Sequence, residues 1–185
     1  AVHERLLRLG PHFRDVSGWE TANWYRRQLY DEPPAAPPQA TYYLPQEQLS
    51  FDKAFWFELW KRQHTACREN VAFFEMSFMA KILVAGEDAG YVLERCCTAR
   101  VDGNVNETVY TQWLDETGRL QGDVTVTKLD SDRFMVVATD TMHRHTQAWL
   151  KRVAQKEGKR VFIHDLTDSL CQLNVHGPNG SEERL

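Results

Sequence analysis

The polar face of one predicted β-hairpin carries the side chains of this sequence that could do chemistry together. On both sides of a loop at residues 115–118, apolar and polar residues alternate, as they do in half-buried strands. With that loop, Tyr110 is expected opposite Asp123, and Gln112 opposite Gln121. A carboxylate in this place could accept or position a proton, and a phenol could supply a hydrogen bond. The same alternation also fits an ordinary sheet whose polar face meets solvent.

The two strands of this hairpin belong to a longer series of predicted helices and strands. Apolar residues at spacings of three and four predict helices over 53–69, 86–96 and 141–157. The first of these helices is expected to be amphipathic, with Trp56, Phe57, Trp60, His64 and Cys67 at these spacings. Strands are predicted over 73–84 with a break near Ser77, and over 108–114, 120–128, 133–138, 160–163 and 170–175. This order indicates an α+β domain rather than a doubly wound parallel sheet.

The composition of the chain changes near residue 50. Six of its seven prolines lie within residues 1–45, and the run at 33–38 has to be extended because proline fixes φ. We therefore expect residues 1–50 to form an extended arm and residues 51–185 to form the domain. The arm carries large rings that are not expected to stay in water, namely Trp19, Trp24 and Tyr25. They are predicted to dock on the domain or on another chain, which makes them candidate partner-binding residues.

Charge and hydropathy exclude several classes of function. The 22 Lys and Arg residues against 26 Asp and Glu residues give a net charge of −4, which argues against a general nucleic-acid coat or a binder of anionic membranes. Hydrophobic residues make up 42% of the chain, which is enough to bury a core. No apolar run approaches the ~18 residues that a membrane helix needs, so no membrane span is expected.

A basic cluster is predicted at the end of the last long helix. Its members are Lys151, Arg152, Lys156, Lys159 and Arg160. Cations at a helix C-terminus are favourable, so the cluster fits a solvated helix end. Contact with RNA or with an acidic partner is the alternative interpretation.

No metal site is expected from the spacing of potential ligands. The four cysteines, Cys67, Cys96, Cys97 and Cys171, contain no CxxC pair and fit small apolar residues in a reducing compartment. His143 and His145 are two positions apart on a predicted helix, so their side chains point to different sides.

Several stretches, taken in order, resemble the first part of the glycine-cleavage T-protein (aminomethyltransferase) fold. They are residues 67–77, 86–89, 109–114, 122–126 and 175–178. The resemblance is greatest to the version carried by mitochondrial dimethylglycine and sarcosine dehydrogenases and by the pyruvate dehydrogenase phosphatase regulatory subunit. Residues 13–25 resemble the linker that joins the flavin domain of those enzymes to this domain.

The resemblance implies both a fold and a site. In that family the domain binds tetrahydrofolate in a central channel, and the folate captures the one-carbon unit released when an N-methyl group is oxidised. By motif position, Asp123 and Tyr110 match the aspartate and tyrosine beside the pterin, which implies catalytic and folate-binding roles. Gln112 and Gln121 lie on the same predicted patch and are further candidates for folate contact. Mitochondrial location is implied by the resemblance as well.

The sequence also departs from the family pattern. Glu75-Met76-Ser77 stands where the family has Asp-x-Ser, and Gly118-Arg119 stands where it has Gly-Gly. The second half of the folate domain and the flavin-binding half are not within these 185 residues. A half channel cannot enclose a cofactor, so no cofactor is expected for a chain of this length alone.

Three hypotheses follow from the sequence. The first is a non-catalytic interaction subunit of a larger mitochondrial assembly, built on a truncated T-protein-like domain. The second is a fragment or subunit of a tetrahydrofolate-linked dimethylglycine or sarcosine dehydrogenase. The third is an RNA-associated accessory protein that uses the basic cluster.

Overall fold

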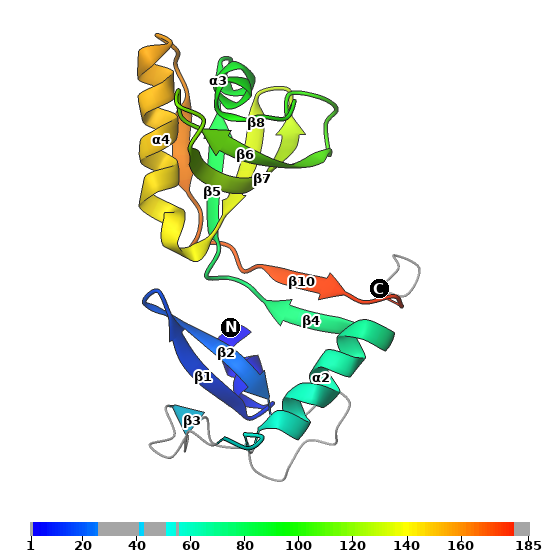
Figure 1. Ribbon diagram of the computed structural model, residues 1–185. Coiled ribbons are helices and arrows are strands. Elements are labelled where there is room, and N and C mark those ends of the chain that lie inside the picture. Colours follow the sequence, from blue (N-terminus) through cyan, green and yellow to red (C-terminus); the bar gives the residue numbers. More distant parts are fainter. Residues whose placement is uncertain (1, 26–40, 43–50, 55, 180–185) are drawn as a thin grey trace. The chain divides into compact units, whose positions relative to one another are not determined.

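The computed structural model describes residues 2–25, 41–42, 51–54 and 56–179. The chain folds into two compact units, each with its own sheets and helices (Figure 1). The first unit comprises Ala1–Met76 and Cys171–Leu185, and the second comprises Ser77–Leu170. This division does not follow the boundary expected near residue 50, because the chain leaves the first unit at Met76 and returns to it at Cys171.

The second unit is built on a five-stranded antiparallel sheet in the order β6-β7-β8-β5-β9. Its strands are β5 (Ala80–Ala85), β6 (Thr108–Leu114), β7 (Leu120–Asp130), β8 (Arg133–Ala138) and β9 (Phe162–Asp165). Its helical elements are α3 (Ala89–Cys96), the 3-10 turn η1 (Asp140–Met142) and α4 (His143–Lys156). The predicted α+β class is confirmed, and the strands are placed within a few residues of their expected positions.

The core of the second unit lies on one face of this sheet. Alternate residues of the strands, such as Ile82, Val126 and Val136, are completely buried. Leu93 of α3 and Leu150 of α4 join them in the same hydrophobic cluster, so both helices cover this face. Strand side chains alternate between the two faces, which leaves the intervening residues on the face that the helices do not cover.

In its described residues, the first unit contains two small sheets and two helices. Its elements are α1 (Val2–Leu7), β1 (Pro11–Val16), β2 (Trp19–Tyr25), β3 (Thr41–Tyr42), α2 (Phe57–Glu69), β4 (Ala72–Glu75) and β10 (Leu173–His176). One sheet has the order β2-β1-β3, and the other pairs β10 with β4 antiparallel. The predicted break near Ser77 is confirmed, because β4 and β5 belong to different units.

Part of the predicted extended arm is a paired hairpin. Strands β1 and β2 are antiparallel and are joined at Ser17 and Gly18, which both have positive φ, as in tight hairpin turns. The rings of His12 and Trp24 stack with centroids 5.0 Å apart, and Trp24 is only 1% exposed. These rings bury one another, which the composition of the arm did not predict. The proline run at 33–38 lies outside the described residues.

Helix α2 is present as predicted, but its aromatic stripe is not buried. No residue of α2 is fully buried, and Trp60 is 46% exposed. The stripe residues contact one another along the helix instead: Trp60 stacks on His64 at 5.5 Å and meets Trp56 edge-on at 6.5 Å.

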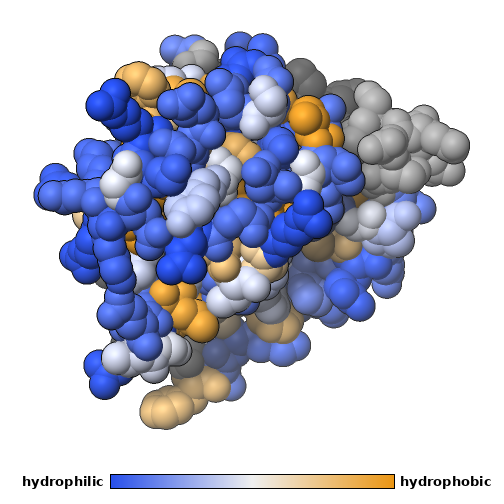
Figure 2. Space-filling view, turned by 90° about the horizontal axis from the view of Figure 1, so that it is seen from above, coloured by the Kyte–Doolittle hydropathy of each residue, from blue (hydrophilic) through white to orange (hydrophobic). Residues whose placement is uncertain are grey.

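The surface is largely polar on the face shown in Figure 2. Hydrophilic side chains cover most of this face, and hydrophobic ones form small separate groups. Within the described residues, no helix is both long and apolar enough to cross a membrane.

Candidate functional site

The candidate site lies on the hairpin of β6 and β7, in a register that differs from the predicted one. Gln112 is directly opposite Asp123, whereas Tyr110 is opposite Thr125. The predicted direct pairs, Tyr110 with Asp123 and Gln112 with Gln121, were therefore wrong. From the pair of Trp113 and Gly122 onward the shift is two residues, and it leaves these side chains on their expected faces, because strand side chains alternate with a period of two.

Two local features cause the shift. Leu114 pairs with Leu120, so the loop is one residue longer than expected, and Gln121 then lies at a bulge before Trp113 pairs with Gly122. The side chain of Asp115 organises the loop: its Oδ1 accepts hydrogen bonds from the backbone N–H of Thr117 at 2.8 Å and of Arg119 at 3.0 Å. The hydroxyl of Thr117, which donates to the same oxygen at 2.7 Å, and these backbone hydrogen bonds hold the pKa of Asp115 below its ordinary value.

Three of the four predicted polar residues lie together on the open face. The amide Nε2 of Gln112 donates to Oδ1 of Asp123 at 3.3 Å. Tyr110 lies diagonally across from Asp123, and its hydrogen bond to that carboxylate raises the pKa of the phenol. Gln121 does not join them, because its amide donates to Oδ2 of Asp115 at 3.1 Å.

This cluster is open to solvent. The Tyr110 side chain is 64% exposed, Asp123 is exposed and Gln112 is half-buried. A carboxylate, a phenol ring and an amide on one flat face can pair with the hydrogen-bonding edge of a planar ligand and contact its ring. The arrangement therefore fits one side of a binding site for a polar heterocycle.

The opposite face of the same hairpin is tightly packed. Trp113 is completely buried, and its indole N–H donates to Sγ of Cys97 at 3.1 Å. The buried Thr111 hydroxyl accepts a hydrogen bond from the backbone N–H of Ala99 at 3.1 Å. Burial raises the pKa values of Cys96 and Cys97 to about 12, so both thiols stay protonated at neutral pH.

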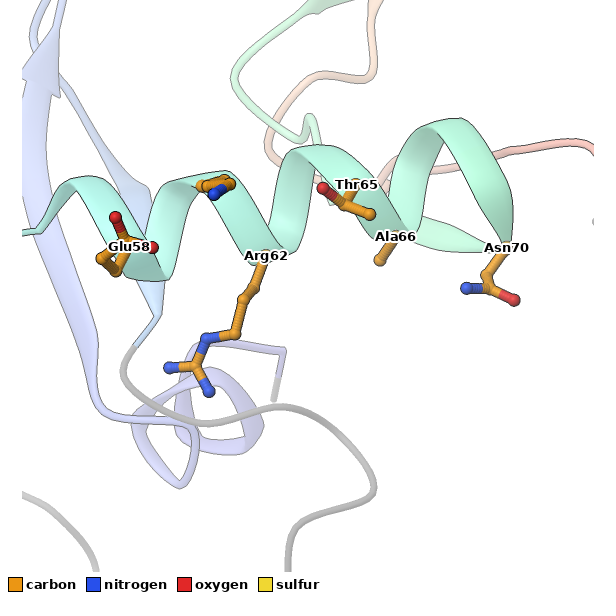
Figure 3. A pocket seen from close by; sticks show the side chains of 6 residues that line it. Glu58, Arg62, Thr65, Ala66 and Asn70 are labelled. Atoms are coloured by element: carbon orange, nitrogen blue, oxygen red, sulfur yellow. The ribbon is translucent and has the colours of Figure 1, made fainter.

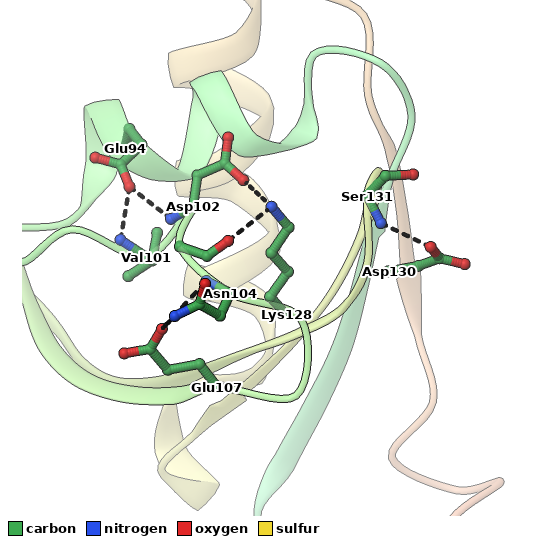
Figure 4. Close-up of polar contacts among 9 residues, drawn as sticks. Glu94, Val101, Asp102, Asn104, Glu107, Lys128, Asp130 and Ser131 are labelled. Carbon is green, nitrogen blue, oxygen red and sulfur yellow. Dashed lines mark hydrogen bonds and ion pairs between the residues drawn. The ribbon is translucent and has the colours of Figure 1, made fainter.

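A second set of polar contacts holds the loop between α3 and β6 (Figure 4). The Nζ of Lys128, on β7, donates to Oδ1 of Asp102 at 2.6 Å and to the carbonyl oxygen of Gly103 at 3.0 Å. Glu94 on α3 accepts backbone hydrogen bonds from Val101 and Asp102, each at 2.6 Å. The sequence contained one signal for these contacts. The charged residue Lys128 follows the inward-facing valines of β7 at the same spacing of two residues.

The predicted partner-binding rings have different environments. Trp24 is packed inside the first unit and is not available as a surface docking residue, which corrects its assignment. Trp19 and Tyr25 are half-buried, and their role in docking stays a prediction. The backbone oxygen of Tyr25 accepts a hydrogen bond from Nε2 of Gln63 at 2.8 Å, and burial raises the pKa of its phenol to about 12.

Most members of the predicted basic cluster have partners within the second unit. Lys156 forms an ion pair with Glu116, and Arg152 lies over the ring of Trp149 at 5.5 Å. Lys159 forms an ion pair with Asp88 at 2.9 Å. The backbone N–H of Arg160 and the ammonium of Lys159 hydrogen-bond the Asp88 carboxylate, which lowers its pKa. These contacts explain the cluster as a structural feature, and nothing supports contact with RNA.

Two hollows in the first unit contain none of the predicted folate-site residues. One, of about 360 Å³, runs along α2 and is lined by residues of that helix together with Asn70, with Arg62 extending away from the helix (Figure 3). The other, of about 660 Å³, lies between the end of α2 and the strands β4 and β10, where Arg68, Phe74 and His176 are among its lining residues. Within residues 2–25, 41–42, 51–54 and 56–179, no group of three or more His, Cys, Asp or Glu side chains could hold a metal ion.

Comparison with known families accounts for nearly the whole chain. The GCVT N-terminal domain matches residues 2–183. The chain belongs to the GCVT N-terminal domain family. A crystal structure of the glycine cleavage system aminomethyltransferase T from Bartonella henselae has the same fold, with a TM-score of 0.69 at 20% identity over 97% of this chain and 39% of that one. The predicted T-protein-like fold is thereby confirmed.

Two relatives of this GCVT-type chain are long enzymes. It is 36% identical over 181 residues to 4-methylaminobutanoate oxidase (formaldehyde-forming) of Paenarthrobacter nicotinovorans, covering 98% of this chain and 20% of the relative. It is 27% identical over 201 residues to mitochondrial sarcosine dehydrogenase of Mus musculus, covering 96% of this chain and 22% of the relative. The chain thus spans about a fifth of the length of these relatives.

Proposed function

We propose that this chain provides the Tyr110–Asp123 face of a tetrahydrofolate site in an enzyme that oxidises N-methyl amines. The observation that supports this most is the intact cluster of Tyr110, Gln112 and Asp123 within a GCVT-type domain. Two relatives that match almost the full chain are named as an oxidase and a dehydrogenase of N-methylated amino acids. The name of the first also gives formaldehyde as a product, and formaldehyde is the free form of the one-carbon unit that a folate would take up.

The residues of the cluster suit such a site. Tetrahydrofolate, when bound, supplies the amine nitrogens that take up a one-carbon unit. The Asp123 carboxylate would accept or return a proton at such a nitrogen and so act as a general base. Tyr110 contributes a ring face and a hydroxyl whose interaction with Asp123 raises the pKa of the phenol. Because Tyr110 and Asp123 are exposed, the opposite side of the ligand has to be covered by other parts of the protein.

The experiment that tests this function measures the binding of tetrahydrofolate to the intact protein, with an Asp123→Asn variant beside the wild type. We expect the wild type to bind and the variant to lose at least about tenfold in affinity, as the loss of a hydrogen bond to a charged group implies. Asp132→Asn is the matched control, because Asp132 is an exposed aspartate of the same unit that lies outside the hairpin. Equal affinities for the wild type and Asp123→Asn would refute the proposed role of Asp123.

A second candidate function is the non-catalytic interaction subunit. The 64% exposure of Tyr110 favours it, because a side chain so open is not enclosed around a ligand by the described residues. Absence of tetrahydrofolate binding by the intact wild-type protein would select this candidate over the enzyme. Mitochondrial location remains a prediction for both, because one relative is mitochondrial by name and the other comes from a bacterium.

A further inference from the structure

We propose that Gln112 is the positioning residue of this site, and that it orients the Asp123 carboxylate rather than binding the ligand itself. The effect of Gln112 on ligand binding rests on the proposed function. The hydrogen bond by which Gln112 orients Asp123 does not depend on any ligand. Gln112 and Gln121 were expected to face each other, but in the structure Gln112 hydrogen-bonds Asp123 and Gln121 hydrogen-bonds Asp115. This difference between two residues of the same type is the basis of the inference.

In the described part of the chain, two side chains interact with the Asp123 carboxylate. Gln112 Nε2 donates to its Oδ1 at 3.3 Å, and the hydroxyl of Tyr110 is its other partner in the described part of the chain. An exposed aspartate on a flat sheet has several side-chain rotamers of similar energy. A donor directly opposite, on the neighbouring strand, selects the rotamer in which the carboxylate faces β6.

The backbone of Gln112 is itself fixed from outside the hairpin. Its carbonyl oxygen accepts a hydrogen bond from the backbone N–H of Thr98 at 3.0 Å. The next residue, Trp113, is buried, and it pairs with Cys97 in an isolated β-bridge. The segment after α3 therefore holds the part of β6 from which the Gln112 amide extends.

An amide suits this role chemically. It donates two hydrogen bonds from one nitrogen and exchanges no proton near neutral pH, so it can hold an ionised carboxylate without competing for the substrate's proton. Gln112 also hydrogen-bonds Tyr110, and this contact lowers the pKa of the phenol, whereas the contact of Tyr110 with Asp123 raises it. The pKa of the Tyr110 phenol therefore responds to both Gln112 and Asp123.

The test is a double-mutant cycle read out by the pKa of Tyr110 in the intact protein. The tyrosines carry ¹³C at the hydroxyl-bearing carbon, and a Tyr110→Phe variant assigns the signal. In the wild type, Asp123→Asn should lower the pKa of Tyr110, because it removes a negative charge and a charged acceptor. In a Gln112→Met background, the same substitution should produce less than half of that shift, because Asp123 is no longer held beside the phenol.

Gln121→Met is the matched control for this cycle. Gln121 is the same residue type in the same hairpin, but its amide is bound to Asp115 and not to Asp123. In that background the full effect of Asp123→Asn on the pKa of Tyr110 should remain. An undiminished effect in the Gln112→Met background would overturn the positioning role.

Binding of tetrahydrofolate separates the failure of this inference from the failure of the proposed function. If both hold, Gln112→Met weakens binding about tenfold, and Gln121→Met leaves it unchanged. If the wild type binds no tetrahydrofolate, the proposed function fails while the pKa cycle still decides the role of Gln112. If binding depends on Asp123 but the cycle shows no coupling, the function stands and the positioning role is refuted.

Discussion

The two faces of the β6–β7 hairpin differ in almost every physical respect. On one face, Trp113 is completely buried and its indole N–H donates to Cys97, whereas on the other, Tyr110 is 64% exposed and interacts with Asp123 and Gln112. The buried face contributes most of the free energy of folding of this hairpin, because apolar burial scales with area removed from water. The open face contributes little stability and is available for a ligand. The residues that stabilise the hairpin and those of the candidate site thus alternate along the same strands.

Trp113→Ala, on the buried face, is the substitution for which we expect the largest loss of stability. Removing a fully buried indole leaves a cavity and deprives Cys97 of its donor, which should cost about 3–5 kcal/mol in free energy of unfolding. Urea denaturation of the intact protein measures it. Leu120→Ala, at a 62% exposed position of the same hairpin, is the control and should change stability by less than about 0.5 kcal/mol. A cost below about 1 kcal/mol for Trp113→Ala would contradict the contrast between the faces.

A smaller effect is expected for Gly122→Ala, which adds one methyl group to the buried face beside Asp123. The added Cβ would lie 3.2 Å from the Trp113 ring, closer than ordinary van der Waals contact. Overpacking of this kind costs about 1–3 kcal/mol. Gly118→Ala is the comparison. That glycine has a positive φ, so an added methyl group strains the backbone, but open space surrounds it and no ring is displaced. We expect Gly122→Ala to displace the Trp113 ring, which an altered indole fluorescence spectrum would show and which Gly118→Ala should not cause.

The division between the two faces could be predicted from the sequence, but the register could not. Alternation of Val124 and Val126 with polar neighbours identifies the buried face because water is excluded from it. The register depends instead on the bulge at Gln121 and on the loop that Asp115 organises, and both are local hydrogen-bonding choices with no periodic signal. The direct pairing of Gln112 with Asp123 was missed for that reason.

The first unit was harder to predict because its burial does not follow a simple period. Trp24 and His12 stack across the β1–β2 hairpin, in a segment whose prolines and rings favoured an extended arm. On α2, the spacing of Trp60 and His64 is typical of a buried stripe, yet the two rings stack on each other and remain on the surface. Periodicity therefore located the helix correctly but does not show how much of it is buried.

The smallest expected effect is the pH dependence of stability that comes from Tyr110. Its hydrogen bond to Asp123 raises its pKa in the folded state above the ordinary value of about 10. The stabilising contribution is therefore fully present below the unfolded pKa, and it is lost as the pH rises through the folded pKa. Tyr110→Phe removes this contribution, so the urea midpoint of the wild type should exceed that of the variant at pH 8. The difference should narrow by pH 11, where the unfolded phenol is ionised. A midpoint difference that stays constant over this range would show that the phenol is not coupled to Asp123, and the open face would then be no more than a solvated surface.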